Sequence, residues 1–174
     1  MSIKKVDFNR YLKDAVEQLP KGAFLCTKDG EKENVMSVGW AAFGSMWGRP
    51  VLIVTIRPSR YSCELIDKTG EFTISIPLNQ SQKDNINFCG SYSGRERNKF
   101  EEKSLIKGKG QTLDIPVIDN CQLFYECKVI TKQELNADML DDSIKQMYYP
   151  HGNYHIVYYA EIIDSYVLED DYLK

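Results

Sequence analysis

Helical spacing of apolar residues is confined to a few segments of the chain, and strand-like spacing covers most of the rest. Residues 7–19 and 59–68 carry apolar side chains three and four positions apart, which predicts two amphipathic helices. Asp7 is expected to cap the first helix, and Gly70 to end the second in a left-handed conformation. Shorter helical or turn segments are expected over residues 80–89 and 138–147.

Six apolar runs have the length and composition of strands. They are residues 23–27, 34–43, 51–57, 71–78, 116–135 and 154–168. The run at 51–57 is β-branched on both faces, as in a strand buried on both sides, and a glycine-rich turn joins it to 34–43 in a predicted hairpin. The run at 71–78 alternates and contains Pro77, which predicts a half-buried strand near a sheet edge. Six antiparallel strands with peripheral helices predict a mainly β fold, a small closed or nearly closed barrel.

Composition narrows the class of protein further. The chain has 174 residues, 43% of them hydrophobic and 27% charged, which is typical of one globular domain covering residues 1–174. The longest purely apolar run, Val51–Val54, is too short to span a bilayer, and no signal peptide is visible, so we expect a cytoplasmic protein without a membrane partner. A net charge of −3 gives no reason to expect nucleic-acid binding.

Several well-defined chemical motifs are absent. The sequence has no GxGxxG, no Walker-type GK[ST], no GxSxG and no HExxH, which removes the arguments for a Rossmann site, a P-loop or a serine hydrolase. His151 and His155 are separated by a glycine-containing segment and do not form a helical zinc pair, so no metal site is expected. The five cysteines form no CxxC pair, and reduced thiols are the expectation.

An anion site is suggested where the 51–57 strand meets the helix that follows it. The sequence RPSRYS places Arg57, Ser59 and Ser62 around the start of that helix, where free backbone N–H groups and the helix dipole favour negative charge. A purely structural interpretation also fits, because Ser59 is a good N-cap and Arg57 could pair with an acidic residue. The residues alone leave both interpretations open.

Four segments together resemble the flavin reductase-like family, the FMN-binding split barrels that include flavoredoxin. They are NVMSVGW (34–40), RPSRYS (57–62), SGRERNKF (93–100) and the Tyr-His pair at 154–155. The resemblance covers about Ala23 to Ile163 and implies a six-stranded antiparallel split β-barrel. Asn98 stands where the family more often has Asp, which affects hydrogen bonding within the third segment.

The resemblance assigns roles to particular residues. Along the edge of the isoalloxazine ring it places Asn34, Val35, Met36 and Ser37. At the FMN phosphate it places Arg57, Ser59 and Ser62. In or beside the loop that closes over the flavin it places Cys89, Gly90, Ser93 and Lys99. The same residues have structural interpretations, since Val35 could be core, Ser37 a polar alternate on a strand, and Cys89 a small core residue.

His155 is the candidate catalytic residue, because the family's Tyr-His pair reaches the cavity over the flavin. An ordinary histidine pKa would then make the reaction rate change near pH 6–7. The structural alternative is a hydrogen-bonded, partly buried strand histidine without a catalytic role. His155→Ala is expected to keep the bound flavin and to slow its reduction.

The resemblance implies an oxidoreductase that uses FMN, with FAD less favoured, and NAD(P)H as a transient electron donor. Electrons would pass to free flavin, iron or a redox protein. The alternatives are an FMN electron carrier without its own NAD(P)H site, and a flavin-free barrel. A homodimer is expected from the family's habit and from a surplus of large apolar residues. These are Trp40, Phe43, Met46, Trp47 and the pair Tyr158–Tyr159.

Overall fold

The structure is a computed structural model that describes residues 2–79, 81–103 and 105–169. Its main sheet contains eight antiparallel strands in the order β3-β2-β6-β9-β10-β5-β4, with β1 paired to the C-terminal part of β10. The strands of this sheet are β1 (Ser2–Lys5), β2 (Ala23–Asp29), β3 (Lys32–Val38), β4 (Ala41–Met46), β5 (Arg49–Ile56), β6 (Glu71–Ile76), β9 (Leu123–Glu134) and β10 (Ile156–Glu169). A separate antiparallel pair consists of β7 (Lys107–Lys109) and β8 (Pro116–Ile118). The prediction of a mainly β antiparallel fold is confirmed.

The main sheet has eight strands instead of six, partly because the predicted run 34–43 is two strands. Its first part, β3, pairs with β2, and its second part, β4, pairs with β5. Between them the chain passes close to the short 3-10 helix η1 (Leu19–Lys21), since a Cβ on Gly39 would lie 3.1 Å from the Leu19 carbonyl oxygen. The predicted hairpin is therefore β4–β5, and its turn contains Trp47 and Gly48, both with positive φ. The N-terminal strand β1 was not predicted.

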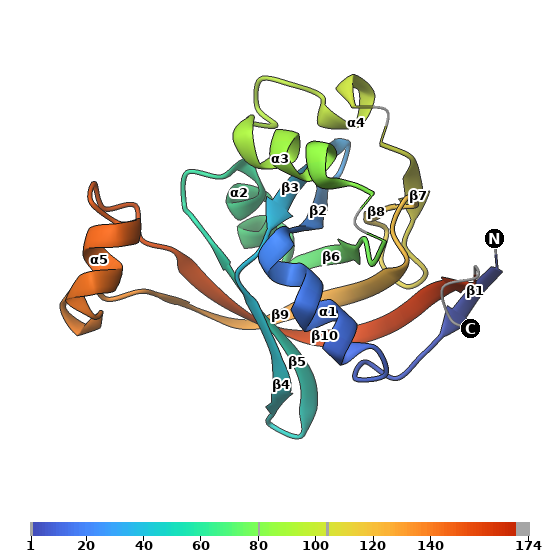
Figure 1. Ribbon diagram of the computed structural model, residues 1–174, viewed down its shortest axis with the longest axis horizontal. Coiled ribbons are helices and arrows are strands. Elements are labelled where there is room, and N and C mark those ends of the chain that lie inside the picture. The colour runs from blue at the N-terminus through green and yellow to red at the C-terminus, as the bar shows by residue number, and fades with distance from the viewer. Residues whose placement is uncertain (1, 80, 104, 170–174) are drawn as a thin grey trace.

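The helices are short and surround the sheet. They are α1 (Leu12–Gln18), η1 (Leu19–Lys21), α2 (Tyr61–Thr69), α3 (Lys83–Ser91), α4 (Lys99–Glu102), η2 (Ala137–Met139) and α5 (Asp142–Tyr148). Figure 1 shows α2, α3 and α4 grouped near β2 and β3, whereas α5 lies apart at the end of β9 and β10. None of the helices in the described ranges is long and apolar enough to cross a membrane.

Two predicted helix caps are wrong and one helix end is right. The N–H of Arg10 donates to the Asp7 carbonyl in a turn that precedes α1, so Asp7 is not the cap of this helix. The N-cap of α2 is Arg60, in an extended conformation, so Ser59 stands outside the helix. Gly70 ends α2 with φ of 68°, as predicted from the tolerance of glycine for the left-handed region.

The strand β6 is buried on both faces, contrary to the half-buried edge strand that alternation and Pro77 predicted. It lies between β2 and β9 in the sheet, and β8 covers its polar face. Thr73 donates its hydroxyl to the Pro116 carbonyl at 2.6 Å, and the Ser75 hydroxyl accepts the N–H of Ile118 at 3.0 Å. These hydrogen bonds allow polar side chains to be buried where the alternation predicted exposure.

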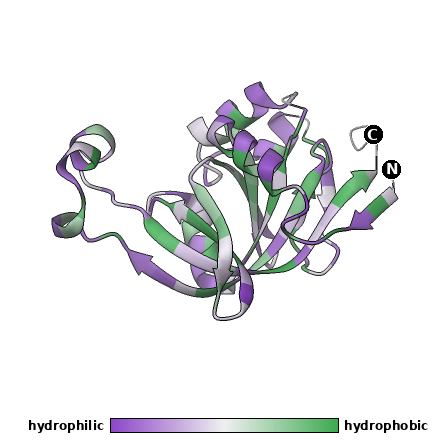
Figure 2. Cartoon of the chain, turned by 60° about the horizontal axis from the view of Figure 1, so that its bottom comes forward, coloured by the Kyte–Doolittle hydropathy of each residue, from purple (hydrophilic) through white to green (hydrophobic). Residues whose placement is uncertain are grey.

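Two apolar clusters form the core, and alternate residues of β2 contribute to both. Leu25 belongs to the first cluster, while Phe24 and Cys26 belong to the second. Figure 2 shows hydrophobic residues concentrated along the strands and hydrophilic residues on the helical layer. All five cysteines are buried free thiols.

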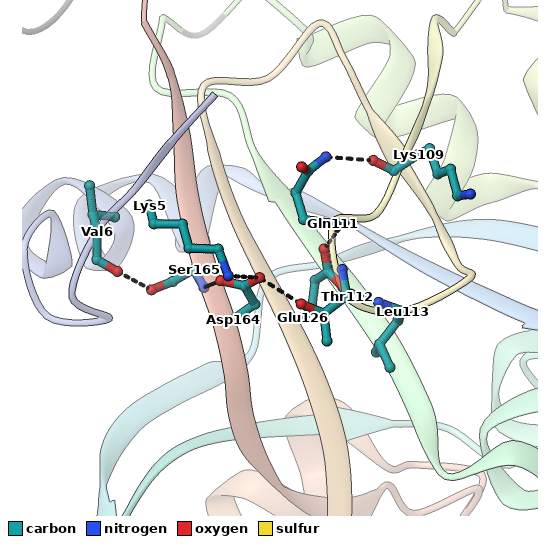
Figure 3. A network of polar contacts seen from close by, with 9 residues as sticks. All are labelled: Lys5, Val6, Lys109, Gln111, Thr112, Leu113, Glu126, Asp164 and Ser165. Atoms are coloured by element: carbon teal, nitrogen blue, oxygen red, sulfur yellow. Dashed lines mark hydrogen bonds and ion pairs between the residues drawn. The ribbon is translucent and has the colours of Figure 1, made fainter. Parts of the chain in front are cut away.

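A buried polar network fixes the loop at residues 110–115 to the centre of the sheet (Figure 3). The carboxylate of Glu126 on β9 is fully buried and accepts three backbone N–H groups of the loop, those of Gln111, Thr112 and Leu113. Next to it, Asp164 on β10 accepts the Thr112 hydroxyl at 2.7 Å and pairs with Lys5 at 2.9 Å. The same network therefore holds the loop and the N-terminal strand β1.

Candidate functional site

A cavity of about 280 Å³ lies where three predicted motifs meet. Its walls come from β3, the start of α2, the end of α3 and the loop after α3. The wall residues are Asn34, Met36, Arg57, Ser59, Arg60, Tyr61, Cys89, Tyr92, Ser93, Gly94, Lys99 and Asn153. Of the residues proposed from the sequence as cofactor ligands, this set contains Asn34, Met36, Arg57, Ser59, Cys89, Ser93 and Lys99. The RPSRYS corner, the NVMS strand and the SGR loop therefore converge on one cavity.

All charged side chains among the described wall residues of this cavity are cationic. Arg57, Arg60 and Lys99 line it, and none of its described wall residues is an aspartate or glutamate. The N-terminus of the nine-residue helix α2 adds the positive end of its dipole, because Arg60 and Tyr61 also belong to the wall. The donor set matches a phosphorylated, anionic ligand.

Arg57 stands at the edge of the cavity, with part of its guanidinium already engaged. Its Nη1 donates to the Asn153 carbonyl at 2.9 Å and its Nη2 to the Tyr148 carbonyl at 2.7 Å. The guanidinium carbon lies 5.0 Å from the ring centroid of Tyr149. A guanidinium has five N–H donors, so Arg57 can hold this segment and still offer N–H groups to a ligand.

Arg60 is a wall residue that the sequence analysis did not single out, although it lies within RPSRYS. It donates Nη1 to the Gly90 carbonyl at 2.7 Å, which bridges α2 and α3 across the cavity. Gly90 is inside α3, where a Cβ would clash with the Ser37 hydroxyl. Ser37 and Gly90 therefore pack against each other behind the wall, and neither is among the residues lining the cavity.

The wall residue Asn34 is hydrogen-bonded to Ser62, which lies behind the wall. The Asn34 side chain is 3% exposed and donates to the Ser62 hydroxyl at 2.8 Å. Ser62 is fully buried and does not line the cavity, so the structure gives it the role of orienting Asn34. Val35 is fully buried in the second apolar cluster and is among the residues lining a neighbouring cavity of about 590 Å³.

The loop with the sequence SGR separates the two cavities. Gly94 is pressed against the Asn34 amide, where any Cβ would clash, so only glycine allows this approach. Arg95 donates to the Ser59 carbonyl at 3.1 Å and lies 5.2 Å from the ring centroid of Tyr61. Both contacts hold the loop against the start of α2.

Lys99, the first residue of α4, is an almost fully buried cation whose ammonium reaches the end of α3. The residue is 3% exposed, and its ammonium donates to the carbonyls of Cys89 and Tyr92, both at 3.2 Å. Burial, with a smaller contribution from the charge of Arg60, lowers the pKa of Lys99 to about 8. Burial raises the pKa of the neighbouring Cys89 thiol to about 11, so this thiol stays protonated at neutral pH.

His155 does not line the cavity but lies beside it. Its Nδ1 is 2.6 Å from the Tyr149 hydroxyl, and its ring is 4.9 Å from the ring of Trp40. Burial and the charges of Arg57 and Arg60 lower the pKa of His155 to about 4. The ordinary histidine pKa on which the expected rate change near pH 6–7 rests is not found here, and the catalytic role of His155 stays a prediction.

Asn153 is a wall residue that no sequence motif predicted. Its φ of 57° lies in the left-handed region, which asparagine tolerates better than most residues. Its side-chain amide donates to the Ser59 hydroxyl at 2.9 Å. Tyr92 lines the same wall and was likewise missed. Tyr61 and Gly94 lay inside recognised motifs but were not assigned roles.

The sheet order and the helical layer define an antiparallel split barrel with a cavity lined by Arg57, Arg60 and Lys99. The chain belongs to the flavin reductase like domain family, which matches residues 16–173. A relative from Archaeoglobus fulgidus, described as an uncharacterized protein, is 34% identical over 115 residues. That match covers 66% of this chain and 64% of the relative, so it spans less than two thirds of the relative's length.

Solved structures show the same fold. The flavoredoxin from Methanosarcina acetivorans superposes with a TM-score of 0.67 at 24% identity, over 85% of this chain and 68% of that one. An FMN-binding domain of a flavin reductases-like enzyme from Shewanella baltica superposes with a TM-score of 0.69 at 20% identity, over 95% of this chain and 77% of that one. The expected split-barrel class is confirmed by this similarity.

Proposed function

We propose that the protein binds FMN in the 280 Å³ cavity and passes electrons from NAD(P)H through FMN to free flavin, iron or a redox partner. The observation that carries the proposal is a wall with three cationic side chains and no carboxylate among its described residues, at the start of a helix. Family membership supports the flavin, and the FMN named for the Shewanella baltica domain supports FMN over FAD.

The residues present fit the cofactor in two parts. Arg57, Arg60 and the free N–H groups at the start of α2 would hold the phosphate, with Ser59 and Ser93 as further hydroxyl donors. Asn34 and Met36 of β3, which line the cavity, would lie along the ring. When bound, FMN supplies the ring that accepts a hydride, and the protein contributes binding, orientation and electrostatics.

The alternative function is that of an FMN electron carrier without its own NAD(P)H site. The similarity to a flavoredoxin fold supports this alternative. The sequence contains no dinucleotide-binding fingerprint that would favour an NAD(P)H site over it. Absorption spectra separate these functions. Purified protein supplied with FMN should be yellow after gel filtration, and anaerobic NADH or NADPH should bleach it. A yellow protein that neither donor bleaches would be a carrier, and a protein that retains no FMN would overturn both functions.

Two arginine variants test the phosphate site. Arg60→Ala and Arg57→Ala should each weaken FMN binding by about tenfold or more, because a charge-assisted hydrogen bond contributes about 1.5–3 kcal/mol. Fluorescence quenching of FMN measures the affinity. Of the two variants, only Arg57→Ala should also speed amide exchange in residues 148–153. Arg57, unlike Arg60, holds this segment by donating to the carbonyls of Tyr148 and Asn153. Unchanged affinity in both variants would remove the arginines from the site.

A homodimer is the proposed assembly, and the exposed apolar residues suggest where it forms. Met139 is 85% exposed and Met147 69% exposed, both on the segment around α5 that stands away from the barrel (Figure 1). Ile144 and Tyr148 of the same segment are also exposed, and a group of exposed apolar side chains on one surface is typical of an interface. Light scattering at micromolar concentration should give a dimer mass, and Met139→Ser with Met147→Ser should lower it toward a monomer. Val16→Ser, on exposed α1, is the control that should leave the dimer unchanged.

A further inference from the structure

Tyr149, at the C-terminal end of α5, makes a hydrogen bond whose direction can be assigned. Its hydroxyl lies 2.6 Å from His155 Nδ1, and the residue is 5% exposed. Burial raises the pKa of this hydroxyl, so it keeps its proton and has one to donate. Its other hydrogen-bond partner is the backbone N–H of His155, which is a donor, so Nδ1 is the one acceptor that the described residues offer to the hydroxyl proton. The Tyr149 hydroxyl therefore donates, and Nδ1 accepts.

This direction fixes the proton on the other ring nitrogen. An imidazole whose Nδ1 accepts a hydrogen bond is neutral and carries its proton on Nε2. Within the described chain, Nε2 has no hydrogen-bond partner, so its N–H is available to a ligand. The charged and titratable groups acting on the ring are Arg57, Arg60 and Tyr149, and both cations oppose a second proton.

Packing holds the ring in this orientation. The Trp40 ring lies 4.9 Å from the His155 ring, and the Tyr149 ring lies 5.5 Å from it in an edge contact. Arg57 stands over the other side of Tyr149 and also anchors the carbonyl of Asn153, a wall residue of the cavity. The pair is therefore connected to the cavity edge by contacts that leave little freedom to rotate.

We propose that Tyr149 is a positioning residue that fixes His155 as a neutral Nε2–H donor toward an acceptor atom of the ligand in the adjoining cavity. The acceptor would be a carbonyl oxygen or ring nitrogen of a flavin or of its electron donor, so the inference rests on the proposed function. A neutral donor can stabilise developing negative charge without first losing a proton, and its effect would not vary between pH 5.5 and 8.

Nitrogen-15 NMR of the histidine rings tests the assignment in the full-length protein. The chain has two histidines, so His151→Gln leaves only the His155 signals. In this background, the protein with Tyr149 intact should show His155 with a protonated Nε2 and an accepting Nδ1. These signals should not change from pH 5.5 to 8. Tyr149→Phe removes the donor that holds Nδ1 as an acceptor, and should produce mixed tautomers, while the ring stays neutral because burial and the charges of Arg57 and Arg60 remain.

Tyr154→Phe is the matched control, because its ring stacks on Tyr149 at 4.7 Å while its hydroxyl makes no hydrogen bond to His155. This variant should behave as wild type. A proton on Nδ1 in the wild-type protein, or identical spectra for wild type and Tyr149→Phe, would overturn the proposal.

Saturating FMN, followed by NADH, tests the ligand contact, and the Nε2–H signal should shift with one of them. An unchanged signal with FMN visibly bound would overturn this inference alone. Failure to bind FMN by absorbance would overturn the proposed function together with it.

Discussion

Glu126→Ala should lower the free energy of unfolding by about 3–5 kcal/mol, because it leaves one buried and two partly buried backbone N–H groups of one loop without their acceptor. The carboxylate is fully buried in β9 and accepts the N–H of Thr112 at 3.0 Å and that of Leu113 at 2.6 Å. Each unsatisfied buried group costs about 1–3 kcal/mol, and water entering the vacated space would recover part of that cost. Urea denaturation with unchanged slope measures the loss.

Glu134→Ala is the matched control for this result. Glu134 lies near the exposed end of the same strand, and its replacement should change stability by no more than about 0.5 kcal/mol. The stability loss of Glu126→Gln should lie between those of Glu126→Ala and Glu134→Ala. An amide keeps one acceptor oxygen but turns an NH₂ group toward the backbone donors. A Glu126→Ala protein within about 1 kcal/mol of wild type would show that the loop does not depend on this carboxylate.

Local patterns predicted much of the fold but not the pairing of distant segments. The 3.6-residue period located α2, and Gly70 located its end, because both signals are local. The burial of β6 depends on β8, which arrives more than 40 residues later and supplies hydrogen-bond partners for Thr73 and Ser75. Alternation alone cannot show that a polar face will be covered.

The candidate site shows the same division. Motifs placed Arg57, Ser59 and Lys99 at one cavity, because each motif is a short segment with a recognisable sequence. Asn153 and Tyr149 gave no local signal, since their roles come from contacts with Ser59 and His155 made in the folded chain. The low pKa of His155 could not be predicted from the sequence either, because it depends on burial and on two arginines far away in the sequence.

Lys99 should make FMN binding and protein stability depend on pH in opposite directions. Its ammonium is buried, has no carboxylate partner among the described residues, and donates to the carbonyls of Cys89 and Tyr92. Its pKa is about 8 in the folded protein, against an ordinary value of about 10.5. Between these values the unfolded chain holds the extra proton, so the free energy of unfolding should rise with pH, by at most about 3 kcal/mol.

Anion binding should have the opposite pH dependence, because only the protonated form of Lys99 attracts a phosphate or a negatively charged flavin. FMN affinity should fall by about fivefold between pH 8 and pH 9, as the charged fraction declines from about one half to about one tenth. Lys99→Met, of similar length but uncharged, should bind FMN about ten- to a hundredfold more weakly at pH 7 and lose the decline above pH 8. Fluorescence quenching by wild type and variant at matched ionic strength measures both effects, and urea denaturation of the two apo proteins from pH 7 to 10 measures the stability difference. If the FMN affinities of the two proteins decline in parallel above pH 8, another group is responsible and Lys99 does not contact the ligand.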